Sequence, residues 1–128
     1  MRVLLDSHAF FWWAVDHPRL SGKARGAIAD AENEIYVSAV VPWEMATKVR
    51  LGRWDEAKPV IATFDDAILR YGFLPLSITI AHARTAGSLT AAHGDPFDRV
   101  LASQAQLENM PLVTADPAFR LFGTQTIW

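Results

Sequence analysis

The sequence predicts an α/β sandwich with a central, mostly parallel sheet flanked by helices. Short apolar segments rich in β-preferring residues alternate with longer segments whose apolar residues recur at helical spacing. Such alternation over the whole length is typical of parallel strands joined by right-handed helical crossovers. No internal repeat or linker interrupts the pattern, so we expect one domain over residues 1–128.

The first half of the chain is predicted to contain two strands, each followed by helix. Ser7 and Ser21 are candidate N-caps for the first two helices, because their hydroxyls accept hydrogen bonds from free backbone N–H groups. Pro42 is tolerated in the third helix only within its first turn. The expected elements are a strand at 3–5, helices at 9–15 and 21–32, a strand at 35–38 and a helix that ends at Gly52.

In the second half, proline and glycine mark most of the boundaries. Pro75 lies in an apolar run and, lacking an N–H group, favours an edge strand there. Asp95 followed by Pro96 is a strong helix-start signal, with the aspartate as N-cap and the proline in the first turn. The expected elements are helices at 59–71, from Ser77 to near Gly87 and at 96–109, with strands at 73–76 and 112–114.

Composition excludes several classes of protein. The 128 residues include no cysteine, which rules out disulfide scaffolds, zinc–thiolate sites and cysteine nucleophiles. No stretch approaches the ~20 apolar residues that cross a bilayer, and Asp6 interrupts the N-terminal apolar run too early for a secretory signal, so we expect a cytoplasmic protein. The net charge of -2 attracts no nucleic acid globally, so an RNA substrate would need a local basic patch or metal ions.

Four acidic residues are predicted to meet at one edge of the sheet. Asp6 follows the first strand and Asp116 the last clear one, while Glu44 and Asp98 fall in the first turns of helices expected to begin at that edge. In open parallel sheets, ligands bind outside the carboxyl ends of the strands. Clustered carboxylates repel one another unless a cation neutralises them. Oxygen ligands suit magnesium or manganese, and the chemistry such a site supports is metal-assisted hydrolysis of a phosphodiester.

Each acid also has an ordinary structural interpretation. Asp6 could end a strand or cap a helix, and Glu44 could pair with Lys48 at the i,i+4 spacing. A capping role fully explains Asp95, so we rank Asp98 above it as a ligand. Only the joint placement of the acids favours the metal site over these alternatives.

Four motifs in register resemble the PIN domain, specifically VapC-type toxins. Each is weak alone, but the set spans nearly the whole chain and includes a His-x-Asp-Pro-Phe-Asp-Arg segment found in one subgroup. The motifs are Leu-Leu-Asp-Ser-His at 4–8, Ser-x-x-x-Pro-Trp-Glu at 38–44, His-Gly-Asp-Pro-Phe-Asp-Arg at 93–99 and Leu-Val-Thr-Ala-Asp at 112–116.

The resemblance implies a PIN-like three-layer sandwich and a magnesium-dependent endoribonuclease that is toxic to its host and inhibited by a VapB-like antitoxin. It assigns catalysis and metal binding to Asp6, Glu44, Asp98 and Asp116, with Asp95 either an additional ligand or only a cap. Resemblance also suggests a homodimer. As possible substrate contacts, Ser38, Thr114 and Arg99 carry less weight, because a strand-end hydroxyl often bonds locally and an arginine often pairs with a neighbouring carboxylate.

Three other interpretations compete with the toxin, and the first of them fits the sequence poorly. A phosphoacceptor receiver domain would need adjacent early acids and a late lysine, whereas Asp6 stands alone and no lysine follows Lys58. A PIN fold that binds without cutting would have lost an acid, and none is lost. A PIN nuclease of RNA maturation or decay would have no antitoxin gene beside it. For an antitoxin, Phe11, Trp12 or Trp43 could provide apolar surface and the acids a place for a basic side chain.

Overall fold

The computed structural model describes residues 1–128 and contains a five-stranded sheet in which every neighbouring pair is parallel. The spatial order is β3-β2-β1-β4-β5, so the first strand lies at the centre. Its residues Val3, Leu4 and Leu5 are completely buried, as expected of a strand covered on both faces. The strands are β1 (Arg2–Leu5), β2 (Glu34–Ser38), β3 (Leu74–Leu76), β4 (Leu112–Val113) and β5 (Thr126–Ile127).

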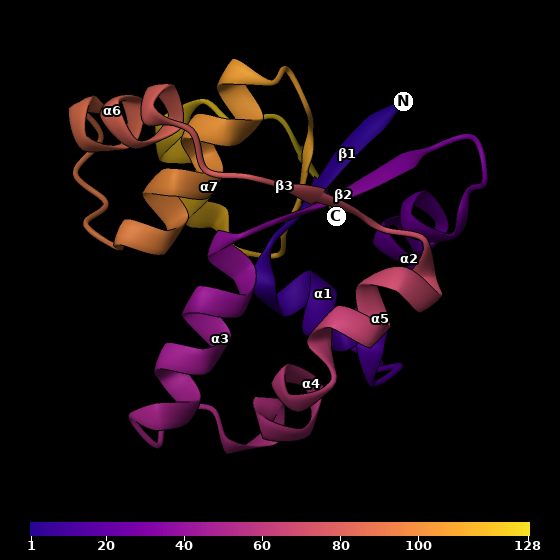
Figure 1. Ribbon diagram of the computed structural model, residues 1–128. Coiled ribbons are helices and arrows are strands. Elements are labelled where there is room, and N and C mark those ends of the chain that lie inside the picture. Colours follow the sequence, from indigo (N-terminus) through magenta and orange to yellow (C-terminus); the bar gives the residue numbers. More distant parts are fainter.

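Helices cover both faces of this sheet. The connections that run outward from β1 to β3 lie on one face, and the connections from β3 back across to β4 and β5 lie on the other, as right-handed crossovers require (Figure 1). The first group is α1 (Ser7–Ala14), α2 (Gly22–Ala29), α3 (Val40–Arg50), the short η1 (Asp55–Ala57), α4 (Lys58–Ala62) and α5 (Phe64–Tyr71). The second is α6 (Ile80–Ser88), α7 (Pro96–Leu107) and the 3₁₀ segment η2 (Pro117–Phe122).

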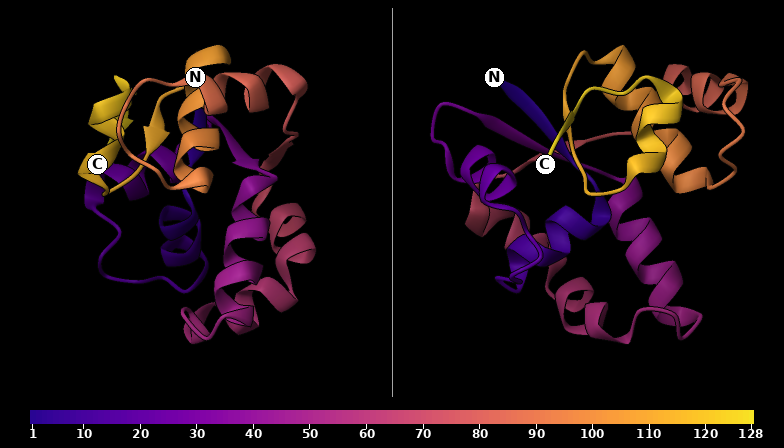
Figure 2. Two further views of the ribbon diagram at one scale, coloured as in Figure 1. Left: turned by 90° about the vertical axis from the view of Figure 1, so that its left-hand side faces the viewer. Right: turned by 180° about the vertical axis from the view of Figure 1, so that it is seen from behind.

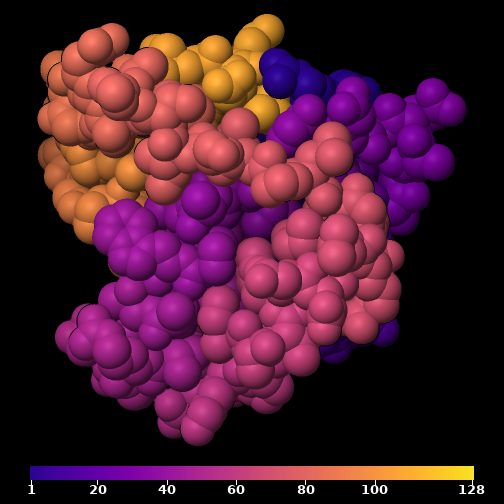
Figure 3. All heavy atoms as spheres, viewed as in Figure 1, coloured from indigo at the N-terminus to yellow at the C-terminus, as the bar shows by residue number.

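One hydrophobic core of 25 buried residues runs through these layers. Phe10 from α1, Met45 from α3 and Leu101 from α7 are among its fully buried side chains. The two further views show that the first and last strands belong to the same sheet, in which β4 lies between β1 and β5 (Figure 2). In the space-filling view, little of the N-terminal segment is visible on this face, because later parts of the chain lie in front of it (Figure 3).

The strand register brings the ends of three strands together. Leu5 pairs with Val37 of β2 on one side and with Val113 of β4 on the other. The polar residues that follow these strands therefore leave the sheet at the same edge. This confirms the prediction that the carboxyl ends of the central strands share one edge.

The predicted fold class is confirmed, and so are most of the elements. β3 is an edge strand that contains Pro75, and Asp95 caps α7 with Pro96 at its first position. Pro42 lies in the first turn of α3, where its missing N–H costs no helical hydrogen bond. The helix expected at 59–71 is interrupted at Thr63, whose backbone (φ -120°, ψ 24°) separates α4 from α5.

Several boundaries differ from the predictions. The N-cap of α1 is Asp6, not Ser7, and α2 ends at Ala29 because Asp30 turns to an extended conformation. α6 is capped by Thr79, not Ser77, in a capping box closed by the His82 ring. β5 was not predicted, because a two-residue strand carries almost no periodic signal.

None of the helices is both long and apolar enough to cross a membrane.

Candidate active site

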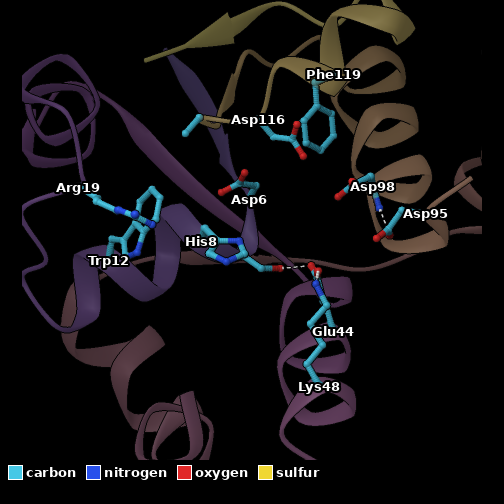
Figure 4. Close-up of a pocket in the computed structure, with 12 residues that line it drawn as sticks. Asp6, His8, Trp12, Arg19, Glu44, Lys48, Asp95, Asp98, Asp116 and Phe119 are labelled. Atoms are coloured by element: carbon cyan, nitrogen blue, oxygen red, sulfur yellow. Dashed lines mark hydrogen bonds and ion pairs between the residues drawn. The ribbon is translucent and has the colours of Figure 1, made fainter. Parts of the chain in front are cut away.

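A cavity of about 350 Å³ opens at the carboxyl ends of β1 and β4. Figure 4 shows side chains from elements on both faces of the sheet pointing into it, with Asp6 at the centre and Asp98 on the α7 side. We call it the acidic cavity, because all five candidate acids line it: Asp6, Glu44, Asp95, Asp98 and Asp116. The candidate acids therefore line one and the same cavity at the predicted edge of the sheet.

Asp6 is nearly inaccessible, with 7% of its surface exposed. Its Oδ1 accepts a hydrogen bond of 2.7 Å from the Ala9 backbone N–H, which makes it the cap of α1. Desolvation by burial raises the pKa of Asp6 from 3.8 to about 7, and hydrogen bonds from the Thr114 hydroxyl and the Ala9 N–H only partly offset this. The negative charges of Asp98 and Glu44 raise it further.

Glu44 is held at both carboxylate oxygens. The Ser7 hydroxyl donates to Oε1 at 2.6 Å, and Lys48 Nζ donates to Oε2 at 2.5 Å. The ion pair predicted as the ordinary alternative for Glu44 thus exists, but the carboxylate is buried and still faces the acidic cavity. Glu44 is the fifth residue of α3, so it lies just beyond the first turn in which it was expected.

Asp98, the third residue of α7, lies partly buried beside His93. His93 Nε2 and Asp98 Oδ2 are 2.7 Å apart. Burial raises the pKa of Asp98 from 3.8 to about 6, the hydrogen bond to His93 lowers it, and the charges of Asp95 and Glu44 raise it. Two charged carboxylates from different elements, Glu44 and Asp98, therefore repel each other across the cavity.

Asp95 and Asp116 have capping roles. Asp95 Oδ1 accepts from the backbone N–H groups of Phe97 and Asp98 at 2.9 and 3.1 Å. Asp116 Oδ1 accepts from the Ala118 N–H at 2.9 Å at the start of η2, and Asp116 is exposed. Both carboxylates line the cavity, but capping the helix that follows is already a sufficient structural role for each of them.

The three residues considered as substrate contacts, Ser38, Thr114 and Arg99, do not line the acidic cavity. Ser38 is buried, accepts from the Val40 N–H at 3.0 Å and lines a different, largely apolar cavity. Thr114 is buried beside Asp6, and its hydroxyl accepts from the Asp116 N–H. Neither hydroxyl lines the acidic cavity, because each closes a local turn.

Arg99 does not face the acidic cavity either. Its guanidinium donates to four backbone carbonyls, those of residues 86, 89, 91 and 93, at 2.6–3.1 Å. With its donors used in this way, Arg99 fixes the segment between α6 and α7, including His93. Of the two roles considered for Arg99, a phosphate contact and a carboxylate pair, this conformation shows neither, because the guanidinium donates to backbone carbonyls.

The aromatic residues divide between core and surface. Phe11 is 7% exposed and packs edge-on against Trp54, so it cannot offer surface to a partner as expected. Trp43 is 53% exposed and contacts Phe97 edge-to-face at the first turn of α7. The ring of His8 stacks on Trp54 at 4.5 Å, and this desolvation lowers the pKa of His8.

The donor set of the cavity fits a hard divalent cation, although the side chains are not gathered around a single point. No three of the acidic or histidine side chains are close enough together to share one ion in this conformation. All the candidate ligands are carboxylates, and burial combined with mutual repulsion raises the pKa of both Asp6 and Asp98. A cation would relieve that repulsion, so the residues are compatible with magnesium or manganese.

Sequence reasoning missed the partners that orient these acids. Ser7 was interpreted as a cap, whereas its hydroxyl reaches across 37 positions to Glu44. His93 was given no role, although it contacts Asp98. Only the i,i+4 spacing of Glu44 and Lys48 was a usable signal in the sequence.

Comparison with known proteins then decides the family. A family model of the PIN domain matches residues 3–124. The chain belongs to the PIN-domain family. Its curated relatives in Mycobacterium tuberculosis include Ribonuclease VapC22, 35% identical over 119 residues, and Ribonuclease VapC16, 37% identical over 79 residues. The former match covers 92% of this chain and 89% of the relative, and the latter 56% of each.

This PIN domain is therefore of the VapC type, and solved structures show the same fold. A structure of VapBC2 from Rickettsia felis bound to a promoter DNA fragment matches with a TM-score of 0.70 at 19% identity, covering 98% of this chain and 97% of that one. FitAcB from Neisseria gonorrhoeae matches with a TM-score of 0.66 at 18% identity, covering 98% and 96%.

Proposed function

We propose that this PIN domain is a magnesium-dependent endoribonuclease, with manganese as an alternative ion, and that it acts as the toxin of a toxin–antitoxin pair. The observation that carries the proposal is electrostatic. Asp6 and Asp98 come from different elements, face one cavity, and both have a raised pKa because burial and neighbouring carboxylates disfavour their charge. A site that concentrates uncompensated negative charge is prepared for a cation.

The names of the relatives support the reaction. VapC22 and VapC16 are both named ribonucleases, and VapC22 aligns with nearly the whole of this chain. An RNA phosphodiester is a substrate that a cluster of carboxylates cannot attract alone, since both are negative. The cation is thus needed for binding as well as for chemistry.

Asp6, Glu44 and Asp98 are the residues that would hold the ion, with Asp116 at the exposed side of the cavity. When bound, magnesium supplies activation of water and neutralisation of the phosphate charge. Ser7 and Lys48 keep the Glu44 carboxylate in one orientation, and His93 does the same for Asp98. Asp95 is better explained as the cap that sets the start of α7 than as a ligand.

We further propose a VapB-like antitoxin as the partner, with the protein acting in the cytoplasm and as a homodimer. Solved structures with the same fold include the VapBC2 and FitAB assemblies. In this chain, exposed Trp43 and its neighbour Phe97 provide apolar surface beside the acidic cavity. An arginine of the partner would suit the carboxylates, because its planar fork donates two hydrogen bonds to one carboxylate.

The proposal is tested by incubating purified protein with RNA in magnesium and in EDTA, alongside the Asp98→Asn variant. We expect cleavage only by the unmodified chain with magnesium, and melting profiles that show both proteins folded. Equal cleavage by the Asp98→Asn variant would count against the acid site.

Co-expression with the adjacent gene tests the proposed partner. If the chain purifies alone, is harmless to its host and has no small gene beside its own, a nuclease of RNA maturation or decay would be favoured instead.

A further inference from the structure

The acidic cavity has a second wall of different chemistry. Opposite Asp95 and Asp98 lie an arginine and a tryptophan, Arg19 and Trp12, with Asp6 between the two sides (Figure 4). Trp12 belongs to α1, and Arg19 to the turn that connects α1 with α2. The cavity is therefore polarised, with carboxylates on one side and an aromatic and cationic surface on the other.

Arg19 is the cation of this cavity that has no anionic partner. Lys48, the other lysine or arginine in the lining, is neutralised by Glu44 at 2.5 Å. The Arg19 side chain is exposed and makes no hydrogen bond or ion pair. Its five N–H donors are free, in a geometry that matches the oxygens of a phosphate.

The turn that carries Arg19 is held rigidly. The His17 N–H donates to the Trp12 carbonyl at 2.8 Å, and the Arg19 N–H donates to His17 Nδ1 at 3.0 Å. Arg25 Nη2 donates to the His17 carbonyl, and the side chain of Leu20 is buried in the core. Because the backbone of Arg19 is already ordered, a ligand that it contacts would not have to supply that ordering entropy.

Trp12 is fixed next to this turn by aromatic neighbours. The His17 ring stacks on it at 5.8 Å, and the rings of His8 and Trp128 lie at 5.5 and 5.6 Å. Trp12 nonetheless remains partly exposed and lines the cavity. A partly exposed indole beside an unpartnered guanidinium is a combination that binds a nucleotide, with the base against the ring and the phosphate on the arginine.

We propose that Trp12 and Arg19 form a binding subsite for single-stranded RNA, holding the nucleotide next to the phosphate that is cleaved. This inference rests on the proposed ribonuclease function and extends it to the position of the substrate. RNA then lies across the cavity with one phosphate on Arg19 and the adjoining phosphate over the acids.

The experiment measures the binding of a fluorescein-labelled single-stranded RNA by fluorescence anisotropy over a range of salt concentrations. The Asp98→Asn chain in magnesium serves as the background, because it should leave the RNA intact. Arg19→Gln should weaken binding about 5- to 20-fold and reduce the slope of log Kd against log salt by about 0.7, the value for one lost phosphate contact on a single strand. Arg19→Lys should restore the slope.

Trp12 has a different signature. Trp12→Leu should weaken binding several-fold and leave the salt slope unchanged, because stacking on a base involves no counterion release. Trp12→Phe keeps a ring for the aromatic neighbours and should bind RNA more tightly than Trp12→Leu. Arg84→Gln is the matched control, since Arg84 is exposed on α6 and outside the cavity, and it should change neither the affinity nor the slope.

Equal affinity and slope for Arg19→Gln and Arg84→Gln would overturn the subsite. So would an Arg19→Gln chain that binds RNA normally but no longer binds a co-expressed protein partner, because Arg19 would then serve the partner. Failure of the proposed function is distinguished separately: the unmodified chain with magnesium would leave the same RNA uncut, whatever the binding slopes show.

Discussion

Asp6→Asn should stabilise the metal-free protein at neutral and alkaline pH. Asp6 is 7% exposed, and burial raises the pKa of its carboxyl group from 3.8 to about 7. A rise of about three pH units, at about 1.4 kcal/mol per unit, corresponds to ~4 kcal/mol of stability lost once the group is ionised in both states. Asparagine removes the charge and still offers an oxygen to the Ala9 N–H, so the cap of α1 is retained.

The sign of the pH dependence follows from proton binding. Between about pH 4 and pH 7 the folded protein keeps a proton on Asp6 that the unfolded chain has released, so the stability of the natural chain falls as pH rises through this window. Below pH 4 both states are protonated, and the variant and the natural chain should be equally stable with respect to this group. The advantage of Asp6→Asn should therefore be full at pH 8 and vanish near pH 4.

Urea denaturation in EDTA at pH 4 and pH 8 measures this difference. With an m value of about 2 kcal/mol/M, the midpoint of Asp6→Asn should exceed that of the natural chain by ~2 M at pH 8. Magnesium at pH 8 should raise the midpoint of the natural chain more than that of the variant, since the variant lacks one ligand. Asp66→Asn, at an exposed aspartate of α5, is the control and should leave the pH dependence unchanged.

The reasoning would be refuted if Asp6→Asn were no more stable than the natural chain at pH 8 in EDTA. It would also fail if the stability difference were the same at both pH values, because a packing effect has no such pH dependence.

Three further predictions concern other parts of the site. In an RNA cleavage assay with magnesium, Asp95→Asn should retain far more activity than Asp98→Asn, because asparagine also caps a helix; equal losses would make Asp95 a ligand. Lys48→Met should lower the free energy of unfolding at pH 7, measured in urea, by about 1–3 kcal/mol, because the buried Glu44 carboxylate would keep only the Ser7 hydroxyl as a partner. Lys48→Arg should restore most of this stability. An unchanged free energy of unfolding in Lys48→Met would mean that the ion pair does not stabilise the fold. Arg99→Met should lower the free energy of unfolding by about 2–4 kcal/mol and speed amide hydrogen exchange in residues 86–95, because four backbone carbonyls lose their donor. Unchanged hydrogen exchange would contradict the role of Arg99 in fixing this segment.

Local signals in the sequence were sufficient for the fold class and for the main ligand candidates. Alternation of short apolar runs with helical periodicity depends only on neighbouring residues, and so does the Asp95-Pro96 helix start. The order of strand and acid, as at Leu5 and Asp6, is local too. This order predicted at which edge of the sheet the acids lie, because the carboxyl ends of parallel strands share one edge.

Tertiary structure decided how each of these side chains is used. Ser7 donates to Glu44 and not to its own helix, and Arg99 donates to backbone carbonyls and not to a substrate. Adjacent residues also lie in different environments: Phe11 is buried, while Trp12 lines the cavity with Arg19. Periodicity and capping are set by residues within one turn, whereas burial, pKa and hydrogen-bond partners depend on which distant segments pack against a side chain, and that is fixed only when the sheet and its two helical layers come together.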